Sequence, residues 1–481
     1  MDAVRIRRLK RRYRLPASPD DARHRLDRIF GIVLDGRLEL ALERAGFSPH
    51  EQICVRSVSS LFRPRLSLPD ETVATHWSLL LAEAIHSAAE RRSSNTMVRY
   101  ASPMHALTDM AAAVLRGDYR HAWAWRQLGL WSAGEFPSEH EAKNEMVRVL
   151  SCEPRAVVAV LIALVRLGLT GPLAARLLAE DWAVLAVAAA GAAAAPVDLV
   201  RTGQSPAEPP PAGAAQALDA CCYRLLQTSK LAALAVSVVD EVLPALALLV
   251  LIESDPVLAR RARPFLNALL SRVRQELHRR RTANSLHGAY AIETAAQMPE
   301  APGEQEAFAD ALPTPPRIHG RTDYGGLLFL LAVVEDLGLA LRLSETLEPR
   351  PLAWALHLLA LTLIEAPVDD PAALAFAGLA PDAKPPSSAE APPSDEELAI
   401  IHSCDTAILA ELQMRLEHLE LPPDQLLNFV CRRPAVITAD PGWIEVHFRL
   451  EEVSTDLRRV GLDLDPGYMP WLGLVVKFVY E

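Results

Sequence analysis

Few residue groups in this sequence combine the types and spacing that metal binding or catalysis requires. Residues 463–467 read Asp-Leu-Asp-Pro-Gly, and alternating carboxylates are how a calcium-binding loop begins. Such a loop needs further oxygen ligands, but here the following positions include Pro466, Tyr468 and Met469. Asp-Pro-Gly is also a common turn sequence, so we interpret this segment as a structural turn.

Thiol and imidazole groups form no clear metal or redox motif. His402 and Cys404 are zinc-ligand types, but no further ligand lies at the spacing of a zinc site, so we predict no metal. Cys221 and Cys222 are adjacent, and adjacent side chains on a helix diverge, which favours core packing over a redox pair. The six cysteines contain no C-x-x-C pair, which indicates reduced thiols in a cytoplasmic protein.

Motifs for nucleotide binding and nucleophilic catalysis do not occur in the sequence. It has no P-loop, no G-x-G-x-x-G and no G-x-S-x-G. We therefore predict no catalytic residue, no cofactor and no enzymatic activity. An enzyme whose site is assembled from scattered residues is the alternative that this reasoning leaves open.

Two basic segments could contact phosphate groups or an anionic membrane surface. Residues 1–14 hold seven Lys and Arg against one acid, and residues 256–281 carry eight arginines beside an apolar stripe. The net charge of the whole chain is −11, so we expect protein partners, or ion pairs with an acidic helix expected at 394–430, and regard nucleic acid or a lipid surface as the alternative. The N-terminal candidate interaction residues are Arg5, Arg7, Arg8, Arg11 and Arg12.

Tryptophans are grouped in a chain that is only 6% aromatic. Trp123 and Trp125 cannot share one face of a helix, so at least one must contact a second element or a partner. Trp131 follows closely, and the three residues are read either as core packing or as an interface anchor. Tyr468 and Trp471, in the turn-rich connector 461–471, are further candidate interaction residues.

The composition predicts a mainly α protein, in which multi-helix globular domains position these residues. Half of the 481 residues are hydrophobic and only 22 are glycine, and long Ala and Leu runs favour helices. At about 150 residues per domain, the length corresponds to about three domains. No apolar run reaches the ~18 uncharged residues of a membrane span, so we expect none.

Three segments rich in proline and polar residues divide the chain, and we expect them to be exposed linkers. They are residues 202–213, 298–317 and 380–394. The domains expected between them are 1–201, with a basic strand and helices; 214–297, helical; 318–379, with short helices; and 395–481, with an acidic helix and a C-terminal β hairpin.

Local signals place two helices and three strands with particular clarity. A helix is expected at 70–91, and Ser394 with Glu397 forms the capping box of another at 395–421. Strand alternation occurs at 52–68, 443–450 and 472–480. Because an isolated hairpin is marginal in water, we predict that these strands form one small β element, with the edge of 474–480 open to a neighbouring chain.

The sequence also resembles a known family. The segments VRIRRLKRRYRL, ICVRSVSSLFRPRLSL, EPRAVVAVLIALVRLGLTGPLAARLL and TDYGGLLFLLAVVEDLGL resemble the tape-measure-type proteins of bacterial extracellular contractile injection systems. The closing GLDLDPGYMPWLGLVVKFVY is similar to the ending of proteins from such gene clusters. This resemblance implies phage-tail-like particle components as partners, and a location in the cytoplasm or in the assembled particle.

A tape measure is an extended helical ruler, but this chain contains 37 prolines and three expected linkers. The resemblance therefore implies a compact relative of the family's globular part, acting as a non-enzymatic assembly or scaffold component. A helical protein-interaction or regulatory adaptor outside such a system is the second hypothesis, and an enzyme without a recognisable motif is the third.

Overall fold

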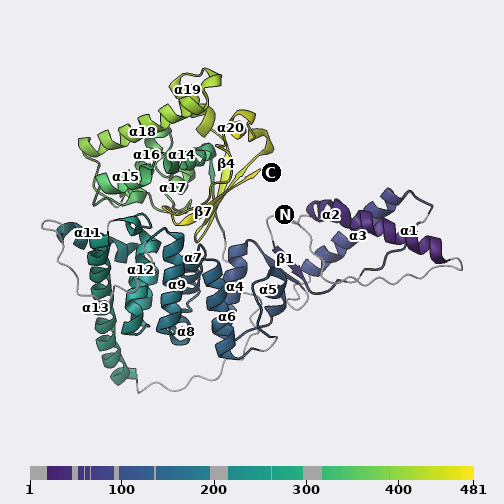
Figure 1. Cartoon of the computed structure of the whole chain (residues 1–481), viewed down its shortest axis with the longest axis horizontal. Coiled ribbons are helices and arrows are strands. Elements are labelled where there is room, and N and C mark those ends of the chain that lie inside the picture. Colours follow the sequence, from purple (N-terminus) through teal and green to yellow (C-terminus); the bar gives the residue numbers. More distant parts are fainter. Residues whose placement is uncertain are drawn as a thin grey trace. The chain divides into compact units, whose positions relative to one another are not determined.

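The structure is a computed structural model that describes residues 19–45, 52–58, 60–65, 67–90, 97–134, 137–195, 215–261, 263–295, 317–388 and 390–480. Its helices outnumber its strands, which confirms the predicted mainly α class (Figure 1). The chain forms two compact units, here called unit 1 (residues 1–145 and 305–314) and unit 2 (146–304 and 315–481). The basic N-terminal arginines, the segment 202–213 and residues 298–316 lie outside the described residues.

Unit 1 contains a packed group of three helices. They are α1 (Pro19–Ile32), α2 (Leu38–Arg44) and α3 (Asp70–Glu90), with the π-helical turn η1 (Val33–Arg37) between the first two. Their apolar faces meet in a core in which the rings of Phe30 and Trp77 pack edge to face, with centroids 4.8 Å apart. Arg25 Nε donates to Asp70 Oδ1 over 2.7 Å, which ties α1 to the start of α3.

Unit 1 also contains the N-terminal strand. β1 (Gln52–Val55) pairs antiparallel with β2 (Met97–Tyr100), and α4 (Pro103–Arg116) and α5 (Ala122–Leu128) follow. α6 (Glu139–Cys152) crosses the boundary between the units. The prediction that residues 52–68 join the C-terminal strands in one sheet is wrong, because β1 covers only four residues and finds its partner in β2. The irregular backbone after Val55 ends the ladder early.

Unit 2 begins with helices that surround one apolar helix, α12 (Leu243–Ser254), whose residues are buried around its whole circumference. The elements around it are α7 (Val157–Arg166), α9 (Ala179–Ala192), α11 (Ala215–Thr228), η2 (Leu231–Val236), η3 (Asp240–Val242), η4 (Leu258–Arg260) and α13 (Arg263–Ala295), and α8 (Thr170–Arg176) packs against α7. The stripe expected on the basic helix, at Leu266, Leu269, Leu270, Val273 and Leu277, is present in α13, where all but the half-buried Leu270 are fully buried.

A five-stranded sheet completes unit 2. Its strands are β3 (Ile318–Thr322), β4 (Ala435–Asp440), β5 (Trp443–Phe448), β6 (Gly467–Met469) and β7 (Leu474–Tyr480), in the order β3-β4-β5-β7-β6. The expected C-terminal hairpin of 443–450 with 472–480 does not form, because β5 and β7 are parallel. The connector contributes β6, which pairs antiparallel with β7, while β5 forms its hairpin with β4.

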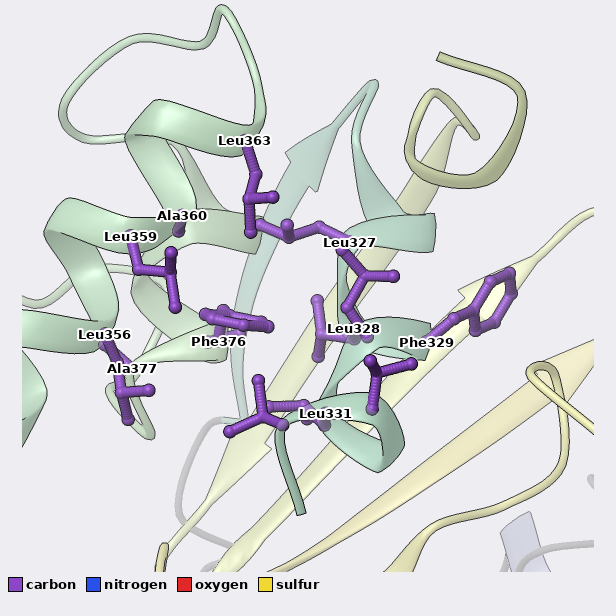
Figure 2. Close-up of a cluster of buried hydrophobic side chains, with 14 of the residues drawn as sticks. Leu327, Leu328, Phe329, Leu331, Leu356, Leu359, Ala360, Leu363, Phe376 and Ala377 are labelled. Carbon is purple, nitrogen blue, oxygen red and sulfur yellow. The ribbon is translucent and has the colours of Figure 1, made fainter. Parts of the chain in front are cut away.

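Helices cover one face of this sheet and form the main core with it. They are η5 (Gly325–Phe329), α14 (Leu330–Asp336), α15 (Leu339–Thr346), α16 (Leu352–Leu363), α17 (Pro371–Phe376), α18 (Asp395–Arg415) and α19 (Pro423–Cys431), with η6 (Pro386–Ser388), η7 (Glu417–Leu419), η8 (Leu450–Glu452) and α20 (Thr455–Arg459) at the periphery. Figure 2 shows Leu327, Leu328 and Leu331 facing Leu359 and Phe376 in this core. The α18 capping box forms as expected, with Glu397 N donating to Ser394 Oγ.

One core therefore joins two segments, 318–379 and 395–481, that the sequence analysis placed in separate domains. Residues 380–394 are an irregular segment along its side. Arg350 anchors this segment by donating to Ala391 O and Pro392 O while pairing with Glu397. The proline content of this segment excludes regular helix without making it a boundary between domains.

Gly326, at the start of η5, lies where a side chain has no room. A Cβ atom there would overlap Val430 O and lie 3.1 Å from Cys431 O. Gly326→Ala is expected to lower the free energy of unfolding by about 3 kcal/mol, measured by denaturant titration, because the crowding atoms belong to backbone. Gly171→Ala is the matched control, since nothing lies within 4 Å of its Cβ position. Equal stability of the two variants would contradict the expectation.

Candidate functional site

Two of the three grouped tryptophans are core residues. Trp125 is fully buried and Trp131 is 3% exposed, and their rings pack edge to face with centroids 5.5 Å apart. Trp125 Nε1 donates to Asp109 Oδ2 over 3.0 Å, and Trp131 Nε1 donates to Gly134 O. The interface-anchor reading is wrong for these two residues, because neither ring is accessible; Trp123 is half-buried.

Asp109 is the polar centre of this part of unit 1. Its Oδ2 accepts a hydrogen bond from Tyr100 OH over 2.9 Å and lies 3.1 Å from His121 Nδ1. Burial raises the pKa of this carboxyl. The hydrogen bond and charge of His121 and the hydrogen bonds from Trp125 and Tyr100 outweigh burial and hold the pKa below its usual range. The arrangement joins β2, α4 and α5, and it is a structural cluster.

The C-terminal candidates also have structural contacts. Trp471 is 1% exposed, and the half-buried ring of Tyr468 is covered by the Arg155 guanidinium, 5.4 Å from the ring centroid. Burial of Trp471 contradicts its expected role as an interaction residue. Burial raises the pKa of Tyr468, with the charge of Arg155 opposing that effect.

The segment 463–467 forms hydrogen bonds with neighbouring parts of the fold, which agrees with its interpretation as a structural turn. Asp463 Oδ2 accepts from Arg458 Nε over 2.9 Å, and Asp465 Oδ1 accepts from Phe478 N over 2.6 Å. β7 lies between β5 and β6 in the sheet. Beyond the end of β6, the backbone N–H of Phe478 on β7 donates to Asp465. The expectation that β7 offers its edge to a neighbouring chain is therefore wrong.

The arginines of the basic segment 256–281 form contacts within unit 2. Arg272 pairs with Asp219 at 2.6 Å, Arg281 with Asp240 at 3.0 Å, and Arg261 with Glu348 at 3.3 Å. These three carboxylates lie on α11, in η3 and just after α15, and none of the three belongs to the acidic helix α18. These contacts favour the internal reading over a phosphate-binding or membrane-binding face.

Cysteine and histidine residues are dispersed. All six cysteines are free, and burial raises the pKa of the Cys222 thiol to about 11. His402 Nδ1 lies 2.7 Å from Leu398 O on its own helix. Within the described part of the chain, no three His, Cys, Asp or Glu residues are placed to hold a metal ion.

The sheet face opposite the core, here called the polar face, carries charged residues in register. One row places His319, Thr438, Glu445 and Lys477 side by side across β3, β4, β5 and β7. Next to it, Arg317 pairs with Asp440 at 2.8 Å and with Glu445 at 2.9 Å. Burial raises the pKa of Glu445, but hydrogen bonds from His447, Trp443 and Arg317, together with the charge of Arg317, outweigh burial and lower the pKa to about 2.

A polar cleft of about 580 Å³ lies at one end of this sheet, where β3 and β5 end and β4 begins. Across the strands, Arg321 is in register with Val436, and Val436 with His447, so the three side chains share the polar face. The complete lining is Arg321, Thr322, Asp323, Tyr324, Pro367, Asp370, Pro434, Ala435, Val436, His447 and Arg449.

Several polar groups of the cleft are already used by the fold. Asp370 caps α17 by accepting from Ala372 N over 2.8 Å, and it accepts from Thr322 Oγ1 over 2.9 Å. Tyr324 OH donates to Glu365 O over 2.9 Å. Burial raises the pKa of the Asp370 carboxyl, and the hydrogen bond from Thr322 opposes that effect. Of the hydroxyl and carboxyl groups in the lining, those of Thr322, Tyr324 and Asp370 are thus held in structural bonds, whereas Asp323 is exposed.

Arg321 and Arg449 differ from these groups. Both are exposed, and among the described residues neither lies within ion-pair distance of a carboxylate. Arg317, on the same face as Arg321 and next to β3, is by contrast fully paired. The cleft therefore presents two available guanidinium groups, with His447 on the strand that Arg449 follows.

Sequence reasoning placed none of these cleft residues in a site. Arg317 fell at the end of an expected linker, and β3 (Ile-His-Gly-Arg-Thr) is short and interrupted by Gly320, which weakens a strand signal. Alternation at 443–450 did indicate that Glu445, His447 and Arg449 share one face. What could not be read locally was that β4 joins β3 to β5, which places Arg321 on the same face as His447.

Comparisons with models of known protein families, with curated proteins and with solved structures found no match to this chain. In the described part of the chain, no helix has the length and apolar character needed to cross a membrane. The longest, α13, carries several arginines.

Proposed function

We propose that this chain is a non-enzymatic assembly or scaffold component that works by binding other proteins. The observation that carries the proposal is that some polar groups of the cleft are hydrogen-bonded within the fold while two arginines are available. Thr322, Tyr324 and Asp370 are held in structural hydrogen bonds, whereas the guanidinium groups of Arg321 and Arg449 have no ion-pair partner among the described residues. Available arginines beside hydroxyl groups that are already hydrogen-bonded favour recognition over bond breaking.

The particle to which it belongs, in this proposal, is a phage-tail-like contractile injection system. The basis is the resemblance of its apolar segments and closing residues to tape-measure-type proteins. The single core that joins residues 318–379 to 395–480 supports a compact component rather than an extended ruler. The basic residues 1–14 are proposed as a second contact with acidic partners, weakened by salt.

Tagging this gene in its host strain and purifying the particles tests the proposal. The tagged chain is expected to copurify with sheath and tube proteins, or to be required for their assembly into full-length particles. An unrelated tagged protein of similar charge is the control for non-specific capture. Deletion of the gene with no change in particle yield, length or activity, together with absence of the tagged chain from particles, would remove the proposal.

A further inference from the structure

We propose that the cleft between Arg321 and Arg449 binds an extended acidic peptide segment of a partner protein. This inference rests on the proposed function, because it names the chemistry by which an assembly component would recognise its partner. Arg321 lies on β3 and Arg449 directly follows β5, so both cations come from strands whose positions the sheet fixes. Because the sheet fixes these backbone positions before a ligand arrives, less conformational entropy is lost on binding.

The register of the sheet sets the spacing of the two cations. Arg321 lies opposite Val436, which lies opposite His447, so the β3 and β5 backbones are about 10 Å apart at two strand spacings. Arg449 follows two residues beyond His447, about 7 Å further along the chain. Because these two offsets are perpendicular, the backbones that carry the two cations are about 12 Å apart. Every second carboxylate on one side of an extended peptide recurs after about 14 Å, a separation that suits two guanidinium groups better than one compact anion does.

Asp323 adds a negative charge to the cleft. It is exposed in the lining, and its charge contributes to the raised pKa of Asp370. An anion between the arginines is therefore attracted by two guanidinium groups and repelled by Asp323. Because the two guanidinium groups come from separate strand positions, two carboxylates on one peptide can each pair with one of them.

A direct binding measurement on the full-length chain tests this proposal. The probe is a fluorescein-labelled peptide of alternating glutamate and serine, followed by anisotropy at about 50 mM salt, with binding weakened at about 300 mM. Arg321→Ser and Arg449→Ser are each expected to weaken binding about threefold or more, and the double variant about tenfold. Arg459→Ser is the matched control, because Arg459 is an exposed arginine outside the cleft.

A gain of binding separates recognition from mere loss of structure. Asp323→Asn removes the repulsive carboxylate and is expected to strengthen binding about twofold, which a damaged fold would not do. The proposal is overturned if the glutamate peptide does not bind the wild-type chain, if a glutamine-serine peptide binds equally well, or if the double variant binds like wild type. Preferential binding of a single-stranded DNA oligonucleotide at this cleft would also overturn it.

The same variants distinguish the two proposals. If the wild-type chain is found in particles and the Arg321→Ser, Arg449→Ser double variant is incorporated equally well, the cleft inference fails while the assembly proposal stands. If neither protein associates with particles and deletion has no effect, the assembly proposal fails whatever the peptide measurement shows.

Discussion

Replacing Asp109 with alanine is expected to lower the free energy of unfolding of unit 1 by about 3 kcal/mol or more. The substitution removes the single oxygen that accepts from Tyr100 OH and Trp125 Nε1 and that faces His121 Nδ1. These groups are buried, so they would lose their acceptor without gaining water. Denaturant titration monitored by tryptophan fluorescence measures the change, since Trp125 and Trp131 lie at the cluster.

Two milder variants show whether the loss comes from this carboxylate. Tyr100→Phe removes one donor together with its need for an acceptor, and we expect a loss of about 1 kcal/mol. Asp109→Asn retains the shape and one acceptor but removes the charge, so its effect should fall between the other two. If Asp109→Ala unfolds at the same denaturant concentration as wild type, the cluster is not a structural centre.

The second large effect concerns pH and the carboxyl of Asp255, which is 6% exposed. Its Oδ2 lies 3.6 Å from Arg224 Nη2, and its Oδ1 has no hydrogen-bond partner in the described part of the chain. Burial raises the pKa of Asp255 to about 6, although the charges of Arg224 and Arg261 oppose the shift. In the unfolded chain the pKa returns to about 3.9.

The direction of the pH effect follows from this difference. Because the folded-state pKa is the higher one, the contribution of the protonated carboxyl is fully present below about pH 4 and is lost as pH rises through 6. At about 1.4 kcal/mol per pKa unit, the loss approaches 3 kcal/mol by pH 8. Asp255→Asn should remove this part of the pH dependence in denaturant titrations between pH 4.5 and 8.

Asp219→Asn is the matched control in the same unit. Its hydrogen bond with Arg272 lowers the pKa of Asp219, so this carboxyl titrates below the tested range. We expect Asp219→Asn to leave the slope of unfolding free energy against pH unchanged. A slope in Asp255→Asn identical to that of wild type would show that Asp255 does not titrate with folding.

Local features of the fold could be predicted from sequence because they depend on residues close together in the chain. The capping box of Ser394 and Glu397 and the buried stripe Leu266, Leu269, Val273 and Leu277 both form as expected. Helix capping and periodicity involve neighbours three or four positions apart. The mainly α class follows from the sum of many such signals.

The candidate site could be predicted only in part. The alternation of 443–450 correctly indicated that Glu445 and His447 share the face opposite the buried Ile444 and Val446. The prediction of an interaction role is wrong for Trp125, Trp131 and Trp471, because composition cannot distinguish an aromatic side chain in the core from one at an interface.

The sequence alone predicts the helical class, the capped start of α18, the polar alternation of β5 and the charge of the basic segments. The tertiary structure is needed to show that β1 pairs with β2 and that β5 and β7 run parallel. It also shows that β4 joins β3 to β5, which places Arg321 on the same face as His447 and at the same cleft as Arg449. These features differ in the range of the interactions that produce them. Strand pairing is chosen by the whole core that the strands enclose, and β3 and β4 are more than a hundred residues apart in the chain.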